Sequence, residues 1–199
     1  MNVLRSVAVI GAGTMGRGIA QVSALAGFAT RLFDVDVQIL EEGMNQIDQQ
    51  LAEGVARDKI TEDDRTLALA HLSAVDDLSE AVQDIDLMIE AVPERMALKQ
   101  RIFVQVEAQA PEHAILASNT SSLSISEIAA STSCPERVIG MHFFNPAPIM
   151  PLVEVVSGNQ SSDATVQRAI LIAEAWGKTV VQASDTPGFI VNRIARPYY

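Results

Sequence analysis

The chain has 199 residues, a hydrophobic content of 48% and a net charge of −11 at pH 7, the composition of a globular protein of one or two domains. Its 14 lysine and arginine residues are scattered along the chain, so no nucleic-acid partner is expected. The single cysteine, Cys134, forms no disulfide within the chain and offers no zinc-ligand pattern, so no metal site is expected.

The first apolar run, residues 6–10, ends at Gly11 and is too short for a signal sequence or a membrane span. We therefore expect a cytoplasmic protein without a membrane partner. The net negative charge gives no long-range attraction for an anionic ligand. A phosphate-bearing ligand would have to be held by helix N-termini and a few placed cations.

Short runs rich in Val, Ile and Leu alternate with segments of helical period, which predicts a parallel sheet with crossover helices. The expected strands occupy residues 6–10, 29–34, 72–75, 86–90, 114–118 and 138–143. The expected helices occupy residues 14–26, 36–57, 62–70, 94–109 and 125–130. Asp36, Thr61 and Ser124 are predicted to cap helix N-termini, Ser124 in a capping box with Glu127, and Gly27 is predicted to end the first helix.

The last strands of the sheet are expected to run differently. Residues 138–143 and 152–156 are joined by a segment with three prolines, which excludes a helix between them. A parallel return needs a crossover of about a dozen residues or more, so these strands are predicted to be antiparallel neighbours. With a helix near 163–176 and a strand at 179–182, the predicted fold class is α/β. It is a Rossmann-type, mostly parallel sheet with antiparallel strands at one end and helices on both faces.

A glycine-rich turn follows the first predicted strand and opens the first predicted helix, which is the context of a dinucleotide site. Gly11 permits the tight turn, Gly13 lets the backbone approach a pyrophosphate, and Gly16 lets the helix pack closely on the strand. Thr14 and Met15 lie at the helix N-terminus and are expected to contact the cofactor.

Asp34 follows Gly13 by 21 positions and ends the second predicted strand, near the spacing of a ribose-binding acid. A carboxylate there accepts hydrogen bonds from the ribose 2′-hydroxyl and repels a 2′-phosphate. The sequence therefore predicts NAD as cofactor in preference to NADP. Asp36 is the competing acid, and helix capping is its preferred assignment.

Two residues near the end of the sheet suggest acid–base chemistry. His142 lies at the C-terminal end of a predicted strand, where open α/β sheets place ligand chemistry. Glu154 lies on the returning strand, within reach of a hydrogen bond that would orient the imidazole as a general base. From the pattern alone, a buried core histidine is an equal alternative.

Four segments resemble the 3-hydroxyacyl-CoA dehydrogenase family and occur in its order: IEAVPE at 89–94, SNTSS at 118–122, HFFNP at 142–146 and DTPGFIVNR at 185–193. The resemblance implies NAD-dependent, reversible oxidation of an (S)-3-hydroxyacyl-CoA to the 3-ketoacyl-CoA, with His142 as acid/base and Glu154 as its partner. The ending at 194–199 is similar to bacterial members that act on 3-hydroxyadipyl-CoA, and 3-hydroxybutyryl-CoA stays equally open.

The same resemblance implies further site residues. Ser121 and Asn192 correspond to residues that contact the substrate oxygen and help hold the histidine region, Asn145 lies near the nicotinamide, and Glu94 and Lys99 contact the cofactor. Simpler roles are open for three of them: a polar turn for Ser121, a strand end for Asn145 and a favourable helix-dipole position for Glu94.

Arg57 and Lys59 resemble in position the family region that contacts CoA, and a solvated basic pair is the alternative. We expect residues 1–184 to form the NAD-binding domain. Residues 185–199 are interpreted as a linker and the first turns of a C-terminal helical domain absent from this chain, which in the family mediates dimerisation. A homodimer is therefore expected for the full-length protein.

Two other functions stay open. Without a C-terminal domain, the chain could be an NAD-binding module with little or no turnover. A hydroxyacid dehydrogenase of the 6-phosphogluconate type shares the glycine turn, but its catalytic lysine motif is missing here.

Overall fold

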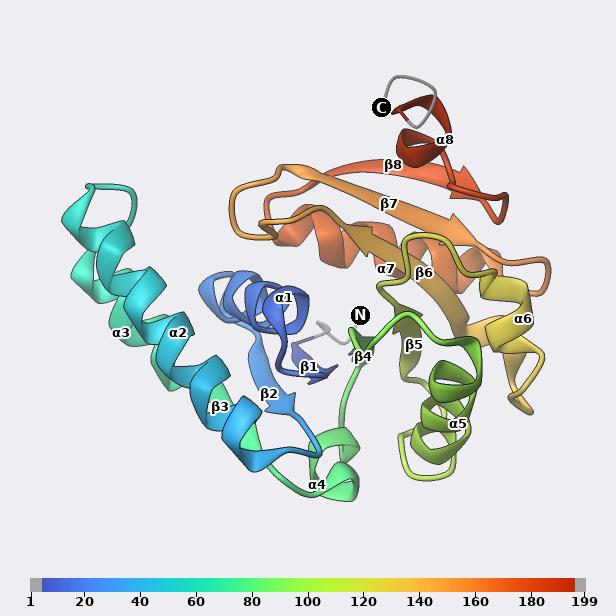
Figure 1. The fold of residues 1–199 in the computed structure, drawn as a ribbon, viewed down its shortest axis with the longest axis horizontal. Helices are drawn as coiled ribbons and strands as arrows, with labels where there is room; N and C mark the ends of the chain where they lie inside the picture. Colours follow the sequence, from blue (N-terminus) through green and yellow to red (C-terminus); the bar gives the residue numbers. More distant parts are fainter. Residues whose placement is uncertain (1–4, 196–199) are drawn as a thin grey trace.

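The computed structural model describes residues 5–195, and within them eight strands form one sheet in the order β3-β2-β1-β4-β5-β6-β7-β8 (Figure 1). The strands are β1 (Ser6–Ile10), β2 (Ala29–Phe33), β3 (Leu72–Val75), β4 (Leu87–Glu90), β5 (Ile115–Ser118), β6 (Val138–Phe143), β7 (Leu152–Ser157) and β8 (Thr179–Ser184). Neighbouring strands are parallel except β6 and β7, which pair antiparallel. The structure confirms the predicted fold class.

The helices that connect these strands are α1 (Thr14–Leu25), α2 (Val37–Ala56), α3 (Glu62–Ala70), α4 (Leu78–Val82), α5 (Met96–Glu107), α6 (Ile125–Ala129), α7 (Asp163–Ala175) and α8 (Val191–Ala195), with a short 3-10 helix at Pro135–Arg137. α4 was not predicted, because five residues are too few to show a helical period. β8 also extends two residues beyond the predicted strand, to Ser184.

Polar side chains set several helix starts as predicted. Asp36 accepts a hydrogen bond from the Gln38 amide at the start of α2, and Thr61 forms a full capping box with Asp64 at the start of α3. Gly27 follows α1 with a φ of 81°, the left-handed conformation that ends many helices.

The prediction for α6 is half wrong. The Ser124 hydroxyl accepts from the Glu127 amide, but Asp185, not Glu127, supplies the carboxylate at this helix start. Asp185 accepts hydrogen bonds from the Ser124 hydroxyl and from the Ile125 and Ser126 amides. The sequence did not show this contact because about 60 residues separate the partners.

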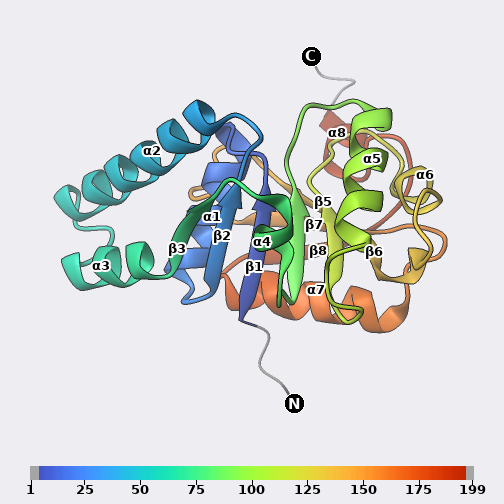
Figure 2. The same ribbon diagram turned by 90° about the horizontal axis from the view of Figure 1, so that it is seen from below.

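The sheet is buried between two helical layers. One apolar cluster joins α1, α2, α3 and α7 to residues such as Val7 and Val9, and the other joins α4, α5 and α6 to residues such as Ala8 and Ile10. Successive residues of β1 thus enter opposite cores, which explains its unbroken apolar run. In Figures 1 and 2, α2 and α3 extend to one side of the sheet, and α5 and α6 lie at the other.

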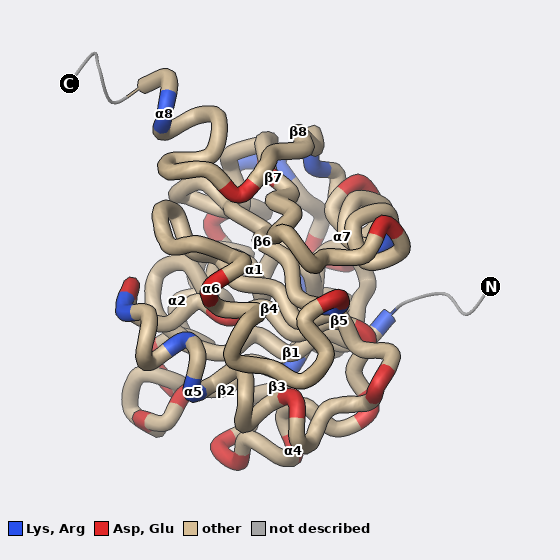
Figure 3. Tube along the Cα trace, turned by 90° about the vertical axis from the view of Figure 1, so that its right-hand side faces the viewer, with Lys and Arg blue, Asp and Glu red and all other residues tan. Residues whose placement is uncertain are grey.

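The charge distribution fits the sequence analysis. Figure 3 shows basic positions dispersed along the trace among acidic ones. Within residues 5–195, no helix combines the length and apolarity that crossing a bilayer requires.

Candidate active site

The glycine turn lies between β1 and α1, and the structure gives a steric reason for Gly11 and Gly16. Gly11 has a φ of 105°, which L side chains rarely adopt. A Cβ on Gly16 would lie 1.6 Å from the Gly11 carbonyl oxygen, so only glycine lets α1 pack this closely. A Cβ on Gly13 would meet nothing within 4 Å, and no side chain caps α1 there. The backbone N–H groups of the first turn of α1 therefore remain available for an anionic ligand.

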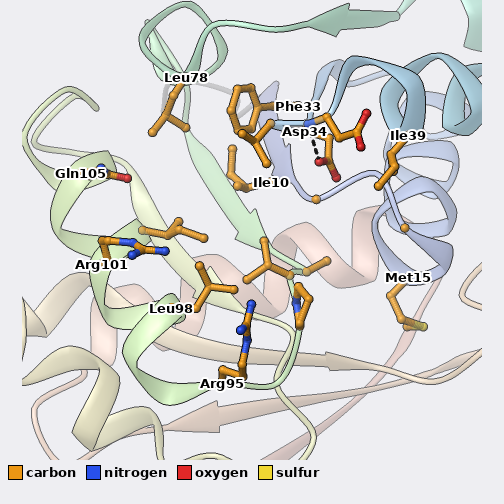
Figure 4. A pocket seen from close by; sticks show the side chains of 18 of the residues that line it. Ile10, Met15, Phe33, Asp34, Ile39, Leu78, Arg95, Leu98, Arg101 and Gln105 are labelled. Atoms are coloured by element: carbon orange, nitrogen blue, oxygen red, sulfur yellow. Dashed lines mark hydrogen bonds between the residues drawn. The ribbon is translucent and has the colours of Figure 1, made fainter.

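This turn borders a cavity of about 930 Å³, whose lining includes Gly11, Gly13, Thr14, Met15 and Asp34 (Figure 4). The lining is mostly apolar, and the cavity is large enough for a dinucleotide. A mostly apolar cavity bordered by an uncapped helix N-terminus fits NAD, because its walls suit flat rings and the helix end suits phosphates.

Asp34 follows β2 directly and is held by the turn it faces. One carboxylate oxygen accepts the Ala12 amide at 2.8 Å, and the other accepts the Asp36 amide at 3.1 Å. Each oxygen keeps a second acceptor site for a ribose hydroxyl. The carboxylate is therefore already oriented before a cofactor arrives.

Two cationic side chains that the sequence analysis did not single out border the same cavity. Arg95 is the N-cap residue of α5 and Arg101 lies on α5. In Figure 4 both side chains point into the cavity from the side opposite Asp34. They are local cations of the kind that an acidic protein needs for a phosphate-bearing ligand. No sequence motif marked them, because only the packing of α5 beside β1 and β4 places them there.

A second cavity of about 410 Å³ adjoins the first, because Met15, Ala91 and Val92 line both. Its lining also brings together five polar residues that come from distant parts of the sequence and were all predicted for the site: Glu94, Ser121, His142, Asn145 and Asn192. Cofactor and reacting group can therefore occupy adjacent spaces.

His142 and Glu154 face each other across the antiparallel pair of β6 and β7. The His142 Nδ1 lies 2.7 Å from Glu154 Oε2, and the two residues are 5% and 0% exposed. A carboxylate only accepts hydrogen bonds, so Nδ1 carries the proton, and Nε2 of a neutral ring holds the free lone pair. This is the arrangement of a general base oriented by a carboxylate.

Glu94 organises the residues that follow β5. It accepts hydrogen bonds from the Thr120 hydroxyl, the Ser121 and Ser122 amides and the Ser122 hydroxyl. Burial raises the pKa of Glu94, but the Thr120 hydrogen bond and the charge of Lys99 outweigh it, so the pKa lies below its ordinary value. α5 begins only at Met96, so Glu94 does not lie in the first turn of a helix. It accepts hydrogen bonds from residues 120–122, the serine-rich loop.

Lys99 is buried beside Glu94 and lines neither cavity. Its side chain is 1% exposed, and its ammonium group lies 2.7 Å from Glu90, 3.2 Å from Glu94 and 3.3 Å from the Val92 carbonyl. Three N–H groups thus have three protein partners. Lys99 thus contacts Glu94 directly, and the cofactor contact that the resemblance assigned to Lys99 stays a prediction.

Side-chain contacts also fix the remaining loops. The Asn192 amide donates to the Ser121 carbonyl at 3.2 Å, so α8 contacts the serine-rich loop. Asn119, which sequence reasoning passed over although it lies in the SNTSS segment, accepts the Phe143 amide at 2.9 Å. Lys178 donates to two carbonyls of the loop that carries Asn145, at 2.6 and 3.0 Å.

Arg57 and Lys59 are not brought to either cavity. Both are exposed beyond the end of α2, and Arg57 pairs with Glu53 one helical turn earlier at 3.2 Å. Their predicted contact with CoA stays a prediction.

The fold, the glycine turn and the adjoining cavity define a dinucleotide-binding domain of the Rossmann class. Residues 6–186 match the model of the family described as "3-hydroxyacyl-CoA dehydrogenase, NAD binding domain". The chain belongs to this family, and its cofactor is NAD.

Similar proteins cover nearly all of this chain. It is 45% identical to a probable 3-hydroxybutyryl-CoA dehydrogenase of Bacillus subtilis over 98% of the chain and 67% of the relative. It is also 45% identical to a 3-hydroxyadipyl-CoA dehydrogenase of Escherichia coli, over 98% of the chain and 41% of the relative. A crystal structure of a 3-hydroxybutyryl-CoA dehydrogenase from Escherichia coli superposes with a TM-score of 0.96 at 44% identity, covering 99% of this chain and 42% of that one. The chain therefore spans two thirds or less of these proteins.

Proposed function

We propose that this chain is the cofactor-binding and acid–base half of an enzyme that oxidises an (S)-3-hydroxyacyl-CoA to the 3-ketoacyl-CoA. The observation that carries the proposal is the buried His142–Glu154 pair, which borders a cavity directly beside the dinucleotide cavity. The relatives, which are 3-hydroxyacyl-CoA dehydrogenases, support the substrate class.

The residues of this chain supply the proton transfer and the positioning. His142 takes the proton of the substrate hydroxyl at Nε2, while Glu154 holds the ring through Nδ1 and stabilises the charge that develops. Ser121 and Asn192 line the same cavity as His142 and are suited to hold the substrate oxygen. Bound NAD, held by the glycine turn and Asp34, supplies the hydride acceptor.

Proton removal has to accompany hydride loss, because an ordinary secondary alcohol is far too weak an acid to ionise beforehand near neutral pH. A base already oriented at hydrogen-bond distance avoids that cost. In the reverse direction the same imidazole, then protonated, returns the proton to the oxygen. The site can therefore catalyse both directions.

The rest of the enzyme belongs to the same proposal. Residues 1–184 form the NAD domain, and residues 185–199 lead into a helical domain that closes the acyl site and joins two subunits; positions 1–4 and 196–199 of these ranges lie outside the described residues. The acyl chain is that of 3-hydroxybutyryl-CoA or 3-hydroxyadipyl-CoA, the substrates in the names of its relatives.

NADH oxidation with acetoacetyl-CoA tests the proposal, on this chain and on a version extended past Tyr199. His142→Gln should lower turnover by a factor of about 100 or more, while the Kd of NADH stays within twofold. His113→Gln, at an exposed histidine, is the matched control. Substantial turnover by His142→Gln contradicts the base assignment. NADH binding without turnover in both lengths favours a binding module.

A further inference from the structure

The segment from Asp185 to Val191, interpreted as a linker and helix start from sequence, lies against the acid–base pair. Its first residue is anchored to α6, since the Asp185 carboxylate accepts the Ser124 hydroxyl at 2.7 Å and two helix amides. A carboxylate with three donors is a firm attachment point. The chain that follows is thereby held at the end of β8, close to β7.

The other end of the segment is attached to Glu154 itself. Glu154 Oε1 accepts the backbone amides of Ile190 and Val191, both at 2.9 Å, while Oε2 accepts His142. The buried carboxylate thus has three donors, and two of them come from this segment. Removing them would leave a buried charge with one partner, which is strongly unfavourable.

Between these two attachments, Phe189 packs against the imidazole. Its ring centroid lies 5.7 Å from that of His142 in an edge-to-face arrangement, and the residue is 2% exposed. Phe144 contacts the same imidazole at 4.5 Å. Phe189 has a φ of 50°, uncommon for a bulky residue, and such backbone conformations persist only where the surroundings enforce them.

We propose that Phe189 and Asp185 are positioning residues that lock His142 in the Nδ1–H tautomer and keep water from the His142–Glu154 pair. The proposal rests on the proposed function for its catalytic consequence. Phe189 restricts rotation of the ring, and Asp185 fixes the segment whose amides hold Glu154. If the ring turned over, Nδ1 would lose its contact with Glu154, so the proton would no longer be fixed on Nδ1 and Nε2 would no longer be the defined base.

The tautomer can be observed directly by 15N NMR of histidine-labelled protein at mildly alkaline pH, where the two ring nitrogens of a neutral imidazole differ strongly in shift. His142→Gln identifies the His142 signals. We expect one locked tautomer in the unmodified chain, and a mixture of both in Phe189→Leu and Asp185→Ala. Asp185→Asn, which keeps an acceptor oxygen, should restore much of the lock.

Phe103→Leu is the matched control, since Phe103 is buried in the same apolar cluster but is not among the rings that contact His142. It should lose similar stability without changing the tautomer. A locked tautomer in Phe189→Leu, or an equal change in Phe103→Leu, overturns the proposal and leaves Phe189 as an ordinary core residue.

Kinetics on the extended enzyme provide the second readout. Phe189→Leu should lower kcat roughly 10- to 100-fold and change KM for the acyl-CoA by less than about threefold. A loss confined to KM contradicts the proposal. The two hypotheses fail separately. If Phe189→Leu releases the tautomer but the extended protein has no turnover, the lock is supported and the proposed function is contradicted.

Discussion

Lys99→Met removes the ammonium group of a buried ion pair while keeping much of the side-chain stem. Glu90 is 0% exposed and would retain only the Ser118 hydroxyl and the Val92 amide as donors. Leaving one charge of such a pair buried costs about 3–5 kcal/mol. Because 1 kcal/mol shifts the Tm of a chain of this size by about 2–4 °C, the Tm should fall by roughly 6–20 °C.

Thermal and urea unfolding of a double-mutant cycle measure this effect. Lys99→Met/Glu90→Gln replaces both charges and should be more stable than Lys99→Met alone, with a coupling energy of about 1–3 kcal/mol. Lys59→Met, at an exposed lysine, should stay within about 0.5 kcal/mol of the unmodified chain. A loss below about 1 kcal/mol in Lys99→Met, or strict additivity, would refute the reasoning.

Two further predictions concern carboxylates. Asp34→Ala should weaken NADH binding about 10- to 100-fold, measured by fluorescence titration, while Asp48→Ala leaves it unchanged; equal affinity in Asp34→Ala refutes the ribose assignment. Burial raises the pKa of Asp185, but hydrogen bonds from Ser126, Ser124 and Ile125 outweigh it and hold the pKa below the ordinary 3.8. The stability that Asp185 contributes is therefore complete above pH 3.8 and is lost as the pH falls through the lowered pKa. The free energy of unfolding in urea should therefore decline less steeply between neutral and acidic pH for Asp185→Asn than for the unmodified chain. Identical pH slopes in the two proteins would contradict this.

Much of the site follows from local sequence signals. The glycine turn and the acid at the end of the second strand are signals within one βαβ unit, and the structure places Gly11, Gly13 and Asp34 around one cavity, with Gly16 packed against Gly11. The proline-rich connection predicted the antiparallel return, and its register places His142 opposite Glu154. Resemblance, not spacing, pointed to Ser121 and Asn192, whose contact joins segments 71 positions apart.

The sequence by itself determined the fold class, the dinucleotide turn and the antiparallel pairing that sets His142 opposite Glu154, because each depends on residues within one strand, one turn or one hairpin. Only the tertiary structure decided which charges pair. Lys99 turns inward to Glu90 and Glu94, Arg95 and Arg101 face the cofactor cavity, and the amides of residues 190 and 191 complete the partners of Glu154. Such pairings depend on where separate elements meet, and a buried charge takes whichever donors the packed chain brings within 3 Å.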